Sequence, residues 1–162
     1  MATGDGRYLT IQQVKDDIPA EILKWLTYGA DHPNTDPTTW TIDDDKIASA
    51  ISRAEDNVDT KIAKRYQVPL DLGSADGAAS EIIRQAALLL VQHVLYSKVG
   101  HADEKRSELA QALSTLDSIA KGERELPGVE VQARKRVYYT APQPKFSRNI
   151  SANTDRVTNV ED

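Results

Sequence analysis

The stretch AASEIIRQAALLLVQHVLYSK, residues 78–98, decides the fold of this chain. It contains neither proline nor glycine. Its apolar side chains wrap most of the circumference of a helix: Ile82, Ile83, Ala86, Leu88, Leu90, Val91, Val94 and Leu95. Helices that are apolar nearly all round lie in the interior of a protein. We therefore expect residues 78–98 to form the central helix of an all-α core.

Two amphipathic helices flank this stretch. In residues 43–66, spacings of three and four residues place one apolar stripe on a helix: Ile47, Ile51, Ala54, Val58 and Ile62. In residues 102–121, a second stripe consists of Leu109, Leu113, Leu116 and Ala120. Gly100 and Gly122 follow the central and the last helix, and glycine commonly ends helices in the left-handed conformation. Each flanking helix is predicted to bury one face.

The first 27 residues predict two short helices. Thr10 and Gln13 fit a capping box at the start of the first helix. Pro19 fits the first turn of the second, which carries Ile22, Leu23 and Leu26. Residues 28–41 have no periodicity and contain two prolines, which predicts a surface loop.

The charge of the chain is divided unequally. Residues 131–154 contain five basic residues and no acidic one, whereas the whole chain of 162 residues carries a net charge of −5. The remainder therefore carries −10. Valines and tyrosines between Val129 and Tyr139 indicate a short extended or hairpin segment. We predict four to five helices in a bundle-like core, residues 1–127, followed by an extended, partly β arm, residues 128–162.

Composition and motifs argue against an enzyme. The chain has no cysteine, which excludes disulfides, thiol nucleophiles and cysteine-based metal sites. His32, His93 and His101 do not share a ligand spacing, and His93 is expected in the core. We predict no metal, no cofactor and no catalytic residue; a carboxylate-dependent hydrolase is the most distant alternative. Apolar runs are too short for a membrane span, and the N-terminus lacks a signal-peptide layout, which indicates synthesis in the cytoplasm.

The basic arm has three interpretations. It can be a solvated tail, a nucleic-acid contact, or an arm that orders on a partner protein through aromatic anchors and cations. The acidic body opposes nucleic-acid binding, so we favour the third; a small helical packaging or regulatory factor that uses the arm to bind nucleic acid is the alternative function. The candidate partner-binding residues are Arg134, Lys135, Arg136, Tyr138, Tyr139, Lys145, Phe146, Ser147 and Arg148.

Three further stretches carry a family resemblance. Residues 47–59 begin IASAISRA, residues 62–70 read IAKRYQVPL, and residues 113–122 read LSTLDSIAKG and precede Leu126 and Pro127. Together they resemble the Mu-like phage head-tail adaptor family, also called neck connector or head-completion proteins. Arms in that family often contain an Arg-x-Phe-x-Arg-like stretch, to which residues 145–148 are similar.

The resemblance implies a structural role in the virion. Such a protein is expected to form a dodecameric ring under the portal protein and to contact a tail-side neck or tail-terminator protein. It would be made in the host bacterial cytoplasm and would continue the DNA channel without binding DNA specifically. Acidic channel walls would let DNA slide without adhering. Six carboxylates either line this channel or only solvate a helix face, and both interpretations stay open: Asp43, Asp44, Asp45, Glu55, Asp56 and Asp59.

Overall fold

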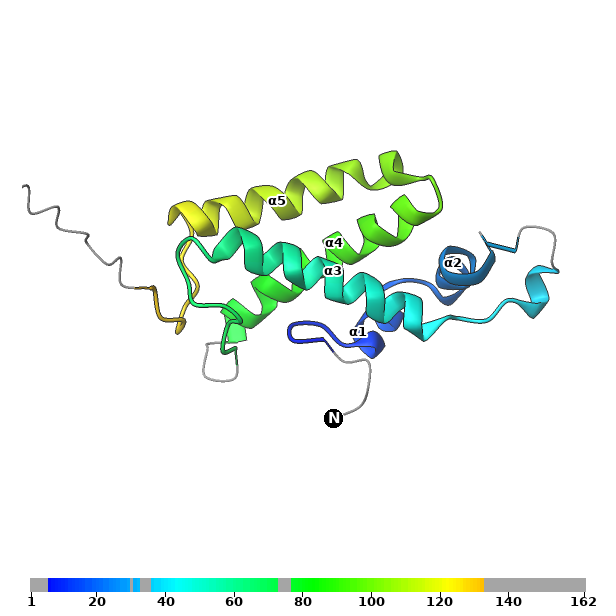
Figure 1. The fold of residues 1–162 in the computed structure, drawn as a ribbon, viewed down its shortest axis with the longest axis horizontal. Coiled ribbons are helices and arrows are strands. Elements are labelled where there is room, and N and C mark those ends of the chain that lie inside the picture. The colour runs from blue at the N-terminus through cyan, green and yellow to red at the C-terminus, as the bar shows by residue number, and fades with distance from the viewer. Residues whose placement is uncertain (1–5, 30, 33–35, 73–76, 133–162) are drawn as a thin grey trace, which may run out of the picture.

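Three long helices build the body of the protein. The structure is a computed structural model, and it describes residues 6–29, 31–32, 36–72 and 77–132. The long helices are α3 (Asp44–Ile62), α4 (Gly77–Lys98) and α5 (Arg106–Lys121). In Figure 1, α3 crosses in front of α4, and α5 lies along one side of both. The C-terminal ends of α3 and α5 lie close together, whereas their N-terminal ends diverge.

The predicted central helix is confirmed. Helix α4 packs against both α3 and α5, and it buries side chains along its whole length, from Ala79 to Leu95. The α3 stripe is also confirmed, because all five of its predicted apolar side chains are at most 1% exposed. The first residue of α4 is Gly77, one position before the predicted range of 78–98.

Helix α3 is shorter than predicted. Asp43 caps its first turn by accepting hydrogen bonds from the backbone N–H groups of Asp45 and Lys46. Its last residue is Ile62, not Tyr66, because a turn follows in which Arg65 N–H donates to the Ile62 carbonyl. Tyr66 instead forms a backbone bridge with Val131. Residues 63–66 thus form a turn that leads from α3 to this bridge.

The buried face of α5 differs from the predicted stripe. The fully covered side chains are Ala112, Leu116 and Ile119, so only Leu116 belongs to both sets. On a helical wheel the two faces differ by about 60°. Leu109 and Leu113 are only partly buried against the core. The crossing of α5 over α4 covers one side of a wider apolar surface and leaves the other side accessible.

The N-terminal part packs against the long helices. Helix α1 (Ile11–Asp17) has the predicted capping box of Thr10 and Gln13. Pro19 is the residue before α2 (Ala20–Lys24), one position earlier than predicted. A π-helical turn (Trp25–Gly29), η1, continues α2, and a 3-10 turn (Pro37–Thr39), η2, interrupts the predicted loop. Leu23 and Leu26 are buried as expected, but Ile22 is 37% exposed.

The described part of the chain is all-α. A 3-10 turn (Ala102–Lys105), η3, takes the place of the predicted first turn of the last helix. Gly122 ends α5 at φ +84°, in the expected left-handed conformation. No strand occurs among the described residues, and Val131 pairs with Tyr66 through an isolated antiparallel bridge instead of forming a hairpin. Val137, Tyr138 and Tyr139 lie outside the described residues, and the division at residue 127 stays a prediction.

Candidate partner-binding surfaces

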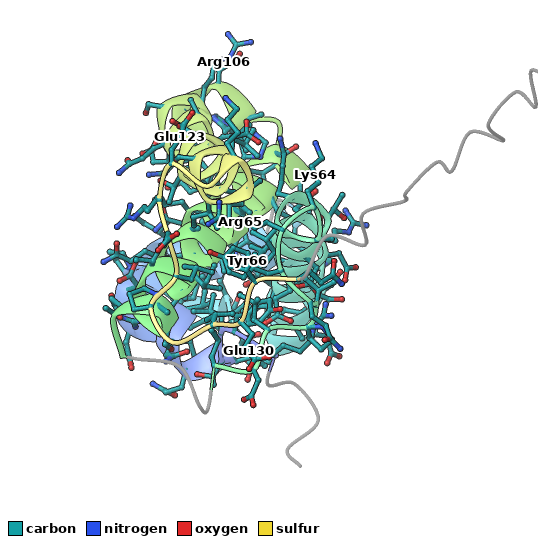
Figure 2. All side chains as sticks on the ribbon, turned by 90° about the vertical axis from the view of Figure 1, so that its left-hand side faces the viewer. Lys64, Arg65, Tyr66, Arg106, Glu123 and Glu130 are labelled. Atoms are coloured by element: carbon teal, nitrogen blue, oxygen red, sulfur yellow. The ribbon has the colours of Figure 1, made fainter. Side chains whose placement is uncertain are left out.

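The segment that follows α5 is fastened to the end of α3. Tyr66 is 1% exposed, and its hydroxyl accepts a hydrogen bond of 3.2 Å from the Leu126 N–H. Gln132 N–H donates to the Arg65 carbonyl at 2.8 Å. Figure 2 shows Arg65 and Tyr66 between the ends of the two helices, within the curve of the segment that runs from Glu123 to Glu130. We call residues 123–132 the arm base, because the predicted arm, residues 128–162, begins within it.

Arg65 joins the arm base to both helices. Its guanidinium lies 3.1 Å from Glu125 Oε1, and its central carbon lies 5.7 Å from the centre of the Tyr66 ring. A β-carbon on Gly122 would lie 1.4 Å from Arg65 Nη1, so any other residue there would require the Arg65 guanidinium to move. Arg65 Nε is buried and has no hydrogen-bond partner among the residues that the structure describes.

Basic side chains line a groove beside the arm base, although the arm base itself carries Glu123, Glu125 and Glu130. Lys61 Nζ lies 2.9 Å from Asp117 Oδ1, and this hydrogen bond is the main reason why the pKa of Asp117 is lowered. Lys64 and Lys121 also lower the pKa of Asp117, and both are exposed. A shallow groove of about 290 Å³ lies here, lined by Lys64, Arg65, Ala120, Lys121, Val131 and Gln132. Val131, which is 50% exposed, adds an apolar contact to this cationic surface.

A second groove lies where α3 and α5 diverge. It has a volume of about 380 Å³ and is lined by Arg53, Asn57, Leu90, His93, Val94, Ser97, Lys98, Leu109 and Leu113. We call it the α3–α5 groove. His93, expected in the core, is only half-buried here, because α3 and α5 separate on this side of α4. Leu109 and Leu113, the side chains that turn away from the buried face of α5, contribute the apolar wall.

The rim of the α3–α5 groove carries positive charge from Arg53 and Lys98. Neither Arg53 nor Lys98 forms an ion pair with any residue that the structure describes. Burial, followed by the nearby charges of Arg53 and Lys46, lowers the pKa of Lys98. Asp31 and Asp43 act in the opposite direction but do not outweigh these effects. An anion placed at this rim would relieve the repulsion between like charges.

The predicted channel-lining carboxylates are spread along most of the length of α3. Asp43 caps α3, and Asp44 lies 2.8 Å from Lys15 Nζ. Asp45 is exposed, and so is Asp56, whose side chain is 70% exposed although it pairs with Arg7. These residues occupy both the start and the middle of α3, so a channel wall built from all of them would need the whole length of the helix to face it.

Glu55 has a role that neither interpretation of the carboxylates anticipated. It is 3% exposed, and its Oε1 accepts hydrogen bonds from the backbone N–H groups of Tyr8, at 2.7 Å, and Leu9, at 3.3 Å. Arg7 Nε lies 3.5 Å from its other oxygen. Glu55 therefore attaches the N-terminal segment to α3 and is not available to line a channel. Glu55 lies four residues after Ile51 and three before Val58, at the edge of the buried stripe, so its spacing is compatible with burial, but its charge gives no indication of the partner.

Tyr8 extends the same polar cluster. Its hydroxyl donates to Asp59 and accepts a hydrogen bond of 2.9 Å from the Leu70 N–H. Burial, and then the bond to Asp59, raise the pKa of Tyr8. Asp59 also lies 2.7 Å from Arg7 Nη1. This cluster ties the N-terminal segment, α3 and the turn before α4 together, and it explains why Asp59 is not a free surface carboxylate.

Comparison with protein families shows which family the chain belongs to. The family model described as "Bacteriophage Mu, Gp36" matches residues 8–137. The chain belongs to this family. It is therefore a Mu-like bacteriophage protein. No curated protein and no solved structure matches the chain.

The Mu Gp36 family match covers both surfaces but only part of the predicted arm. It includes the body, the arm base and the basic residues Arg134, Lys135 and Arg136. It ends before the other candidate arm residues, from Tyr138 to Arg148. All nine candidate arm residues lie outside the described residues. Within the described residues, no group of three or more histidine and carboxylate side chains could hold a metal ion, and no helix is long and apolar enough to cross a membrane.

Proposed function

We propose that this Mu Gp36 family protein is a head-tail adaptor in the phage virion. It forms a ring under the portal protein, connects the capsid to a tail-side neck or tail-terminator protein, and continues the DNA channel. Membership of a Mu-like phage family over residues 8–137 supports this role. The proposed work is structural. That the chain has no catalytic activity stays a prediction.

The arm base is the observation that carries the proposal. Its backbone is held by Arg65 and Tyr66, and the first basic residue, Arg134, follows only two positions after Gln132. The basic stretch therefore starts from a defined point on a surface that already carries Lys64 and Lys121. An arm that is attached to the body at this point, and that carries aromatic residues between its cations, is complementary to an acidic partner surface with pockets for aromatic side chains. We propose that this partner is the portal protein.

The experiment compares two full-length variants for binding to purified portal. One variant changes the arm, with Lys145→Glu, Phe146→Ala and Arg148→Glu. The control reverses Arg106, an 82% exposed side chain at the far end of α5, to Glu. We expect the arm variant to lose at least about tenfold in affinity, since anchor residues dominate interface energies. Undiminished binding of the arm variant would refute the portal contact.

Nucleic-acid binding is the second candidate, and the cationic groove beside the arm base favours it. The two candidates differ in a gel-shift titration of the full chain with duplex DNA. Phosphate contacts by several cations give an affinity that falls steeply with salt concentration. A steep slope, with loss of binding on changing Lys64 and Lys121 to Gln, would favour the DNA contact over the portal contact. An adaptor predicts weak binding at physiological salt.

An acidic channel wall belongs to the same proposal. With Glu55 and Asp59 committed to internal contacts, the exposed candidates are Asp44, Asp45 and Asp56. Repulsion between these carboxylates and phosphates would keep passing DNA from adhering. A charge map of the ring, obtained by imaging an assembled particle, tests this. A continuous basic channel wall would contradict it.

A further inference from the structure

A ring of identical chains needs two different complementary surfaces on each chain. An interface that joins equivalent surfaces closes at a dimer, whereas a head-to-tail contact continues to the next copy. The α3–α5 groove is one candidate surface, because it combines an apolar wall with cations that have no ion-pair partner among the described residues. Its complement should present an exposed apolar side chain next to carboxylates.

The elbow between α1 and α2 has these properties. Among the described residues, only Ile22 and Val131 are large apolar side chains that are exposed. Ile22 lies beside Asp17 and Pro19, and the side chain of Glu21 next to it is 84% exposed. Within the part of the chain that the structure describes, Glu21 pairs only with Lys24 on the same helix, and such exposed pairs are weak and readily exchanged. Lys105, which also lines the hollow beside Ile22, pairs with Glu108. We call Asp17, Pro19, Glu21 and Ile22 the acidic knob.

The knob and the groove lie on opposite sides of α4. Ile22 lines a small hollow together with Gln92 and Tyr96, whereas Leu90, Val94 and Ser97 face the α3–α5 groove. At about 100° per residue, these two sets of α4 positions are roughly 150° apart. One chain therefore cannot place its own knob in its own groove. A second copy can, and its own groove then stays free for a third.

We propose that the acidic knob of one copy docks in the α3–α5 groove of the next copy. This inference rests on the proposed ring. Ile22 would contact Leu109 and Leu113, while Asp17 and Glu21 would place carboxylates beside Arg53 and Lys98. The basic stretch of the arm is a poor occupant, since it has the same sign as the rim. The contact would bury apolar area on both surfaces and would reduce the repulsion among the cations at the groove rim, and both effects favour docking.

Disulfide trapping tests this contact in the full chain, which has no cysteine of its own. The test variant carries Ile22→Cys and Ser97→Cys, one on each surface. Under mild oxidation we expect a ladder of cross-linked oligomers on a non-reducing gel. The matched control carries Ile22→Cys and Glu123→Cys, with the second cysteine at the arm base. A specific contact raises the effective concentration of the two thiols, so the test pair should react at least about tenfold faster.

Two further variants make the result specific. Reversing both rim charges, with Arg53→Glu and Lys98→Glu, should abolish the fast ladder. Adding Asp17→Lys and Glu21→Lys to the same chain should restore it, because the charges are then complementary again. Circular dichroism of each variant shows that it is folded. Restoration would support the knob-and-groove pair, since general destabilisation cannot be reversed by a second pair of substitutions.

The outcomes separate this contact from the proposed function. Equal cross-linking rates for the test and control pairs, or no restoration by the charge swap, would overturn the contact. Rings seen beneath the portal despite such a result would show that the adaptor role stands and uses another interface. Fast, charge-dependent laddering together with absent portal binding would support the contact and refute the portal partner.

Discussion

The two ends of the α3–α5 pair differ in how completely this chain covers them. At the converging end, Tyr66 is 1% exposed, and the arm base satisfies its hydroxyl and the neighbouring backbone. At the diverging end, Leu109 and Leu113 are partly buried, and Arg53 and Lys98 have no ion-pair partner among the described residues. The same two helices therefore form a fully covered core at the converging end and leave a partly exposed surface, suited to a partner, at the diverging end.

The largest loss of stability should follow from a substitution that disrupts the packing at the converging end. We expect Tyr66→Ala to lower the free energy of unfolding by about 3–5 kcal/mol, because it removes a fully buried ring and the acceptor for Leu126 N–H. Tyr66→Phe keeps the ring and should cost about 1–2 kcal/mol. Urea denaturation followed by circular dichroism measures both. A loss below about 1 kcal/mol for Tyr66→Ala would mean that the arm base does not contribute to the core.

The two faces of α5 provide the next comparison. Leu116 is 0% exposed and Leu113 lines the α3–α5 groove, one turn away on the same helix. We expect Leu116→Ala to cost about 3 kcal/mol of stability and Leu113→Ala about 1 kcal/mol or less, since the second side chain is already partly hydrated. Urea midpoints at equal slope give the difference. Equal losses would show that the groove is part of the core.

A substitution at Gly122 should destabilise the converging end less than the loss of Tyr66 does. Replacing it by Ala should cost about 1–2 kcal/mol, because φ +84° disfavours a β-carbon and the new atom would displace Arg65. Gly77→Ala is the matched control, since a β-carbon there has no neighbour within 4 Å. That change should be neutral or stabilise by up to about 1 kcal/mol. Thermal unfolding of both variants distinguishes a local clash from a general effect of losing glycine.

The smallest effect concerns a carboxylate at the diverging end. Hydrogen bonds from Ser107 and then Lys105 lower the pKa of Glu108 to about 2, from 4.5. Because the folded-state pKa is the lower one, this contribution to stability is present above pH 4.5 and is lost as the pH falls towards 2. Ser107→Ala and Lys105→Met should each raise the pKa in an NMR titration, whereas Lys61→Met should leave it unchanged.

An unchanged pKa of Glu108 in both neighbouring variants would contradict this assignment. Lys105, the partner of Glu108, lines the small hollow beside Ile22, so Glu108 lies on that side of α4 and not at the α3–α5 groove.

Much of the fold could be predicted from local patterns, but the sites could not. The central position of α4 and the buried stripe of α3 follow from the spacing of apolar residues, and the capping box at Thr10 follows from a short motif. The role of Glu55 depends on backbone N–H groups 46 and 47 positions away. No periodicity encodes such a partner. Residues 133–162 of the predicted arm, in turn, lie outside the described residues.

The sequence by itself determined the helices, their order and the division of charge between an acidic body and a basic stretch, because these depend on neighbours along the chain. Only the tertiary structure decided which part of each apolar stripe is covered. The angle between α3 and α5 sets how far the helices separate, and this separation rotates the buried face of α5 away from Leu109 and Leu113. Packing geometry therefore decided which side chains are left for a partner.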